Sequence, residues 1–162
     1  MTTEQLQVLA AQVVAKLLAE RKTLATAESC TGGMIASHIT AIPGCSSVFF
    51  GGCVTYTNEI KQKLLGVSAE TLAAHTEISA ETACEMAQGA RERLGTDLAV
   101  STTGIAGPGG GTAEHPVGTV YMAIATEHGT QAVRLKLNDI GRAAVRMEAT
   151  AAVFRALLTT LS

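Results

Sequence analysis

The start of the chain alternates apolar and polar positions with the period of an α-helix. The apolar side chains recur three and four residues apart, at Leu6, Leu9, Val13 and Leu17, with Ala10 and Val14 beside them. Polar residues occupy the other faces, so the pattern predicts an amphipathic helix over 3–21. A short apolar run then predicts a strand over 24–28, and a longer one predicts a helix over 32–41 that ends at Pro43-Gly44.

Capping and turn residues divide the rest of the chain into further elements. Strands are expected at 52–56 and 97–102, and two strands at 117–126 and 131–137 predict an antiparallel hairpin. Helices capped by Asn58, Ser68 and Ser79 end near Leu65, His75 and Leu94, and a last helix covers 140–160 with Val145, Ala149, Ala152, Val153 and Ala156 facing inward. Strands that alternate with helices predict a single layered α/β domain over 1–162, and the hairpin makes its sheet mixed.

Composition and charge narrow the classes of protein and partner. Of the 162 residues, 47% are hydrophobic and 16% are charged, and the net charge of −2 provides no basic surface for nucleic acid or for a membrane. No apolar run is long enough to span a bilayer and the first residues do not resemble a signal peptide, so we expect a cytoplasmic protein. The four cysteines lack metal-binding spacing, so we expect reduced thiols, no metal and no cofactor.

Four polar segments are not explained by a core or by ordinary turns. They are 28–33, 56–61, 101–112, and Arg142 with Arg146. The first three follow or end predicted strands, and ligands of open α/β sheets bind beyond the carboxyl ends of the strands. The sequence therefore predicts one shared site built from these segments.

Ser29, in the run Thr26-Ala-Glu-Ser-Cys-Thr-Gly-Gly33, is a candidate nucleophile at a strand-to-helix junction. The alternative is that Ser29 and Thr31 are turn and capping residues and that the two glycines only allow close packing. No histidine is placed to activate a serine, so the candidate base is Lys61, a lysine whose pKa burial would lower. The alternative for Lys61 is a solvated surface residue.

The glycine-rich loop at 104–111 can bring backbone N–H groups close to a ligand, as an anion nest or an oxyanion hole. Thr102 and Thr103 add hydroxyl groups just before it. Arg142 and Arg146 share one helix face and form a candidate phosphate clamp. A flexible surface loop and a solvated basic edge are the respective alternatives.

Several of these segments together resemble a known family. They are 26–33, Pro43-Gly-Cys-Ser-Ser47, Val54-Thr-Tyr-Thr-Asn-Glu-Ile-Lys61, Leu65-Gly-Val67, Thr103-Gly-Ile-Ala-Gly-Pro-Gly-Gly-Gly111 and Pro116-Val-Gly118. In order and spacing they resemble the CinA C-terminal domain family, which contains nicotinamide-nucleotide amidases. The resemblance runs from about residue 5 to 158. It implies a three-layer α/β/α fold and a homo-oligomer, similar to the stand-alone form without the extra domain of long CinA proteins.

The resemblance also implies an activity, which is hydrolysis of nicotinamide mononucleotide to nicotinic acid mononucleotide and ammonia. It implies Ser29 as nucleophile and Lys61 as general base. The oxyanion would be held by backbone groups of Cys30, Thr31, Gly32 and Gly33, or of Thr103 and Gly104. The nucleotide would be bound by Tyr56, Asn58, Gly107 and Arg142.

The chain departs from the family pattern at Gly51, at His115 and over 137–142. Two other hypotheses stay open beside the amidase. One is a nucleotide-binding module of the same family without activity. The other is a hydrolase that uses the thiol of Cys30 as its nucleophile.

Overall fold

A five-stranded mixed sheet forms the centre of the molecule in the computed structural model, which describes all 162 residues. The strands lie in the order β2-β1-β3-β4-β5 and are β1 (Leu24–Glu28), β2 (Phe49–Val54), β3 (Leu98–Gly104), β4 (Thr119–Thr126) and β5 (Gly129–Lys136). Strand β1 is parallel to both β2 and β3, whereas β4 and β5 continue the sheet as an antiparallel hairpin. The expected mixed sheet is therefore confirmed.

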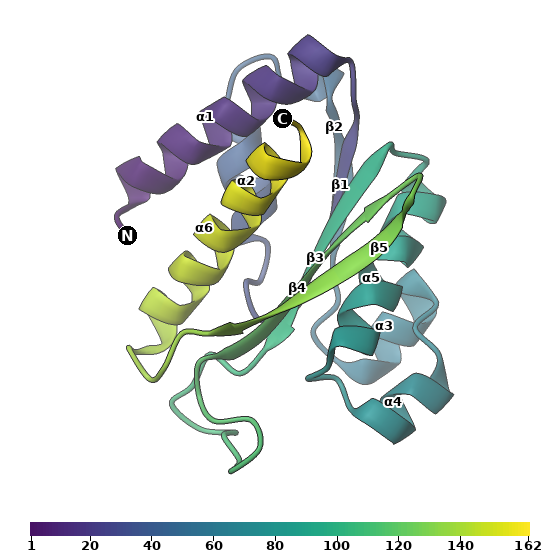
Figure 1. Ribbon diagram of the computed structural model, residues 1–162, viewed down its shortest axis with the longest axis vertical. Coiled ribbons are helices and arrows are strands. Elements are labelled where there is room, and N and C mark those ends of the chain that lie inside the picture. Colours follow the sequence, from purple (N-terminus) through teal and green to yellow (C-terminus); the bar gives the residue numbers. More distant parts are fainter.

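Helices cover both faces of this sheet (Figure 1). One layer consists of α1 (Thr3–Glu20), α2 (Met34–Thr40) and α6 (Arg142–Thr160). The other consists of α3 (Asn58–Leu65), α4 (Ala69–His75) and α5 (Ala80–Leu94), and a short 3₁₀ turn spans Cys45–Ser47. The fold is thus the three-layer α/β/α arrangement expected from the sequence.

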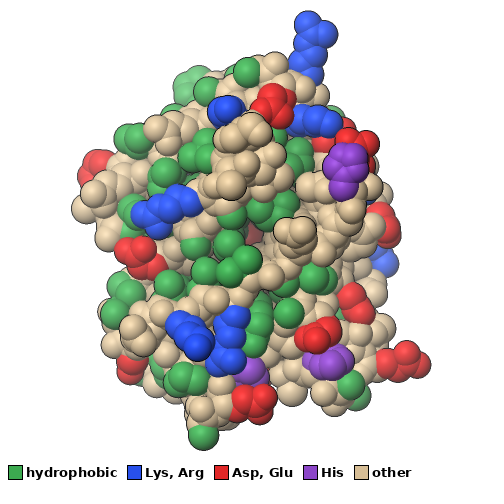
Figure 2. Space-filling model, viewed as in Figure 1, with side chains coloured by type: hydrophobic (Ala, Val, Ile, Leu, Met, Phe, Trp, Pro, Cys, Tyr) green, Lys and Arg blue, Asp and Glu red, His purple; other side chains and the backbone are tan.

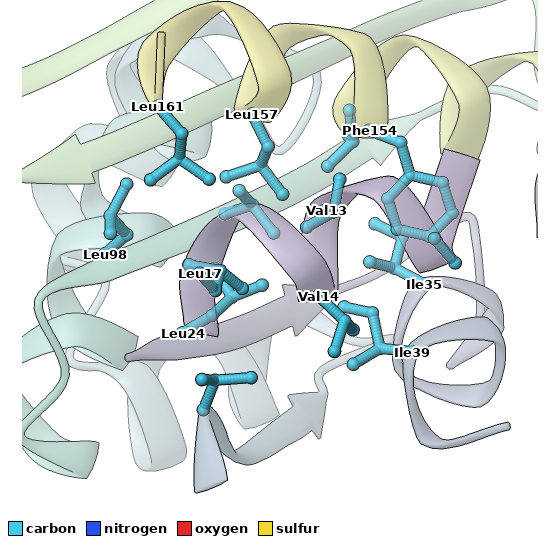
Figure 3. Close-up of a cluster of buried hydrophobic side chains, with 14 of the residues drawn as sticks. Val13, Val14, Leu17, Leu24, Ile35, Ile39, Leu98, Phe154, Leu157 and Leu161 are labelled. Atoms are coloured by element: carbon cyan, nitrogen blue, oxygen red, sulfur yellow. The ribbon is translucent and has the colours of Figure 1, made fainter. Parts of the chain in front are cut away.

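The main core lies between the sheet and the layer of α1, α2 and α6. Figure 3 shows apolar side chains from these elements meeting over the sheet: Val13, Val14, Leu17, Leu24, Ile35, Ile39, Leu98, Phe154, Leu157 and Leu161. Each buried side chain of this size contributes roughly 1.5–3 kcal/mol to stability. In α6, Val145, Ala149 and Val153 are buried as expected, but Ala152 and Ala156 are only half-buried, and the face also includes Phe154 and Leu157.

Most element boundaries differ from the expectations by one to three residues, and three of these differences concern the site. Strand β2 covers Phe49–Val54 rather than 52–56, because Phe49 already pairs with Leu24 of β1. Glycine at 52 leaves room for the Thr26 side chain of that neighbouring strand. The cap of α3 is Thr57, whose Oγ1 accepts from the Ile60 N–H at 3.3 Å, and Asn58 is the first helical residue. Strand β3 continues to Gly104 rather than ending at 102, so Gly104 belongs to the sheet and not to the loop.

The parallel strands all end at one edge of the sheet, and this places the predicted segments together. Ser29 directly follows β1, Tyr56 follows β2, and Thr103 lies near the end of β3. The local sequence only suggested that these residues lie close together, whereas the order of the parallel strands brings them to the same edge of the sheet. No helix combines the length and the hydropathy that crossing a bilayer would require.

Candidate active site

Ser29 and Lys61 form a close pair at this edge of the sheet. Lys61 lies on α3 with only 1% of its surface exposed, and its Nζ donates to Ser29 Oγ at 3.0 Å. It is therefore not the solvated residue considered as the alternative. Burial lowers the pKa of Lys61 below its ordinary value, against the opposing effect of the Glu77 carboxylate.

Two carbonyl groups hold the amine of Lys61 in place. Nζ lies 2.9 Å from the carbonyl oxygen of Thr55 and 3.4 Å from that of Tyr56. A neutral amine has two N–H bonds and one lone pair. With both N–H groups donated to these carbonyls, the lone pair is left to accept the proton of the Ser29 hydroxyl. The arrangement meets the geometric requirement for a serine nucleophile with a lysine base.

Glu28, which sequence reasoning did not single out, supports the turn that carries Ser29. Its carboxylate is 1% exposed and accepts from the Thr31 hydroxyl at 2.6 Å and from the N–H groups of Gly33, Ile35 and Ala36 at 3.0, 3.1 and 2.9 Å. Gly33 provides no side-chain cap to α2, so Glu28 supplies this cap from the end of β1. The available signal was an acidic residue shortly before a helix start.

Arg146 holds the same turn from the opposite side. Its Nε donates to the carbonyl of Cys30 at 3.1 Å and its Nη2 to the carbonyl of Thr31 at 2.9 Å. A Cβ at position 32 would lie 3.1 Å from Nη2, so Gly32 leaves room for the guanidinium. Arg146 does not line the cavity described below. The expected phosphate clamp of Arg142 with Arg146 is therefore wrong for Arg146.

Some backbone N–H groups in the turn after Ser29 donate hydrogen bonds within the chain, and others do not. The Gly32 N–H donates to the Ser29 carbonyl at 3.0 Å, and the Gly33 N–H donates to Glu28. The N–H groups of Cys30 and Thr31 donate to no acceptor in the chain. Since C=O and N–H of a trans peptide point in opposite directions, the bond from Arg146 to the Cys30 carbonyl turns the Thr31 N–H away from Arg146. Two free donors thus lie directly after the candidate nucleophile.

A cavity of about 280 Å³ opens beside the Ser29–Lys61 pair. It brings together most of the predicted site residues, namely Ser29, Cys30, Tyr56, Lys61, Thr103, Gly104, Gly107 and Arg142. In the loop, the N–H groups of Ala106, Gly107, Gly109 and Gly110 donate to no acceptor in the chain, so they are free to meet a ligand.

Other predicted residues lie outside this cavity. The Thr31 hydroxyl is buried between Glu28 and the Thr102 hydroxyl, 2.7 Å away. Gly32 packs under Arg146, and Gly33 is the N-cap residue directly before α2. Asn58 is exposed at the start of α3, where its amide donates to the Glu77 carboxylate at 3.4 Å. These four residues support the site and do not line it.

Arg142 and Tyr56 meet at the cavity. The guanidinium donates to the Tyr56 hydroxyl and to the Gly107 carbonyl, both at 2.8 Å. Both partners are uncharged, so the positive charge of Arg142 has no counter-ion in the chain. Three segments far apart in the sequence are thereby joined at one side of the cavity.

Cys30 and Thr103 line the cavity without being free to react. Burial raises the pKa of the Cys30 thiol to about 12, and no histidine lines the cavity to take its proton. The Thr103 hydroxyl donates to the Glu77 carbonyl at 2.7 Å. The geometry therefore favours Ser29 over Cys30 as the nucleophile.

A second hollow lies elsewhere on the surface. Figure 2 shows hydrophobic side chains gathered on the face that carries α6 and the β4–β5 hairpin. The hollow there has a volume of about 600 Å³, and its walls include Met122, Ile124, Val133 and Ala156. None of the predicted site residues lines it.

Comparison with known proteins gives the same family as the sequence motifs. The model of the CinA C-terminal domain matches residues 6–161. A CinA-like protein of Chlorobaculum tepidum is 55% identical over 126 residues, which is 77% of this chain and 30% of that protein. A putative competence-damage inducible protein of Clostridioides difficile is 49% identical over 138 residues, 85% of this chain and 33% of that protein. The chain thus spans about a third of the length of these relatives.

Solved structures share the whole fold. The competence/damage inducible protein CihA from Agrobacterium tumefaciens superposes with a TM-score of 0.92 at 41% identity, covering 95% of this chain and 94% of that one. A CinA superfamily protein from Escherichia coli superposes with a TM-score of 0.91 at 31% identity, covering 100% and 94%. The layered sheet described above is therefore the fold of this superfamily.

Proposed function

Because the chain belongs to the CinA C-terminal domain family, we propose that it hydrolyses nicotinamide mononucleotide to nicotinic acid mononucleotide and ammonia. The observation that carries the proposal is the 3.0 Å contact between Ser29 Oγ and the buried amine of Lys61, beside a cavity. The family motifs around both residues support the choice of substrate.

In the first half of the reaction, neutral Lys61 accepts the proton of Ser29 while Oγ attacks the carboxamide carbon. The new C–O bond places negative charge on the former carbonyl oxygen, for which the free N–H group of Cys30, a residue that lines the cavity, is a donor. Lys61 then returns the proton to the amide nitrogen, the C–N bond breaks, and ammonia leaves an acyl-enzyme on Ser29.

In the second half, a water molecule takes the place of ammonia. Lys61 accepts a proton from this water while the water oxygen attacks the acyl carbon. The ester bond to Ser29 breaks, Oγ regains the proton from Lys61, and the carboxylic acid leaves. One amine thus serves as base and acid in both halves.

The nucleotide part of the substrate has candidate partners on the cavity wall. Arg142 carries a positive charge without a counter-ion, which suits the 5′-phosphate, and the free N–H groups of the glycine loop lie near it. Tyr56 presents an exposed ring for cation–π contact with the pyridinium. The homo-oligomer that the resemblance implies stays a prediction, which light scattering on the purified chain can check. The cytoplasmic location expected from the sequence also stays a prediction.

The test is ammonia release from nicotinamide mononucleotide by the purified protein. The Ser29→Ala and Lys61→Met variants should lose the activity, whereas Ser37→Ala, at an exposed serine of α2, should keep it. A wild type that binds the nucleotide but releases no ammonia would instead identify a binding module without activity. Loss of activity in Cys30→Ala with an active Ser29→Ala would identify the thiol as nucleophile.

A further inference from the structure

Glu77 is an anionic residue in the wall of the candidate active site that the proposed reaction does not use. It lies between α4 and α5 and is the only acidic residue that lines the cavity with Ser29 and Lys61. Its carboxylate forms no ion pair in the chain, and its one hydrogen bond is with the Asn58 amide at 3.4 Å. A carboxylate is therefore kept in the cavity wall without a cation to neutralise it.

This charge does not help the base. The amine of Lys61 is held by Ser29 and by two backbone carbonyls, not by Glu77. A carboxylate near a lysine favours the protonated form, and Glu77 does raise the pKa of Lys61 against the effect of burial. A general base needs the neutral form, so Glu77 opposes that function of Lys61.

The charged residues that line the cavity suggest a role for Glu77 in binding a ligand. Besides Lys61, the lining holds one anion, Glu77, and one cation, Arg142, and neither has an oppositely charged partner. Such a wall is complementary to a ligand that carries both a positive and a negative group. The substrate proposed above is such a ligand, with a pyridinium ring next to the reacting amide and a phosphate at the other end.

We propose that Glu77 recognises the positive charge of the substrate ring and makes the enzyme selective for amides of pyridinium rings over neutral amides of the same shape. The proposal rests on the proposed function and adds a specificity-determining residue to it. A ring that places its carboxamide at Ser29 occupies the cavity that Glu77 lines. The attraction acts in a cavity that protein partly encloses, where opposite charges interact more strongly than in bulk water.

The test compares two substrates that differ in ring charge. Nicotinamide mononucleotide has a cationic ring, and its dihydro form has a neutral ring with the same carboxamide, ribose and phosphate. Their amides differ in intrinsic reactivity, so the informative quantity is the change in the kcat/KM ratio between wild type and Glu77→Gln. Any change in the basicity of Lys61 affects both substrates and cancels in this ratio.

We expect Glu77→Gln to reduce the preference for the cationic substrate by about tenfold, which corresponds to about 1.4 kcal/mol. Glutamine has nearly the same shape, and the bond from Thr103 goes to the backbone carbonyl of Glu77, so the fold should persist. Glu59→Gln, which removes a charge at an exposed position of α3, is the matched control and should leave the ratio unchanged. A ratio within twofold of wild type in Glu77→Gln would overturn the proposal.

A binding arm separates this proposal from the proposed activity. Dissociation constants of both nucleotides are measured calorimetrically for Ser29→Ala with and without Glu77→Gln. The preference for the cationic nucleotide should again fall about tenfold when Glu77 is replaced. If the wild type releases no ammonia, the amidase fails while this binding ratio still decides the role of Glu77. An unchanged binding ratio would refute that role.

Discussion

Replacing Glu28 with glutamine tests how much of the stability near the site depends on one buried carboxylate. In the protein, Oε2 accepts from Thr31, Gly33 and Ile35, and Oε1 accepts from the Ala36 N–H at 2.9 Å. A glutamine oxygen can take the position of Oε2 and keep its contacts. The amide NH₂ then faces the Ala36 N–H, so one bond is lost and two donors meet.

The magnitude follows from these contacts. A hydrogen bond to a charged group contributes about 1.5–3 kcal/mol, and the three remaining bonds weaken when their acceptor becomes neutral. The favourable interaction of a carboxylate with the start of α2 also disappears. Burying a neutral amide costs less than burying a carboxylate, which offsets part of the loss. We therefore expect Glu28→Gln to lower the free energy of unfolding by about 2 kcal/mol, out of a total of roughly 5–15.

Urea unfolding at neutral pH measures this change. The midpoint should fall without a change in the slope, because the surface exposed on unfolding is the same. Glu20→Gln, at the exposed end of α1, is the matched control and should stay within about 0.5 kcal/mol of wild type. If Glu28→Gln were equally silent, the carboxylate would not be what caps α2, and the reasoning would be refuted.

Three further predictions concern the base, the turn and the helix packing. The rate of ammonia release should rise with pH, and the midpoint of this rise should lie below the ordinary lysine pKa of 10.5, because burial favours neutral Lys61. A midpoint at or above 10.5 in the pH–rate profile would contradict the assignment of Lys61 as the base. Arg146→Met should lower kcat at least about tenfold with little change in KM, because the turn that presents the free N–H groups loses two bonds; an unchanged kcat in steady-state assays would argue against this. Gly89→Ala should lower the free energy of unfolding by about 1–3 kcal/mol despite better helix propensity, because a Cβ there collides with the Leu65 carbonyl; stabilisation in urea melts would disprove the contact.

Local patterns predicted most elements because their causes lie within a few residues. The helical spacing of apolar residues placed α1, and the serines at 68 and 79 cap α4 and α5 as expected, each accepting from an N–H three residues ahead. Strand β2 was predicted at 52–56 instead of Phe49–Val54, because its glycines are typical of a loop. A Cβ at Gly52 would collide with Thr26, which belongs to another strand and cannot be found from local sequence.

The candidate site also has features that the sequence predicted and features that only the tertiary structure decided. The sequence by itself determined the chemical groups, with Ser29, Lys61 and the glycine loop recognisable from their residues and from their places after predicted strands. Only the tertiary structure decided how they are held: Arg146 bonds to Cys30 across 116 positions of the chain, Glu77 reaches the cavity from the α4–α5 connection, and burial lowers the pKa of Lys61. The physical reason is that hydrogen bonds and desolvation depend on distances in space, which strand order sets, whereas helix periodicity and capping depend on neighbours along the chain.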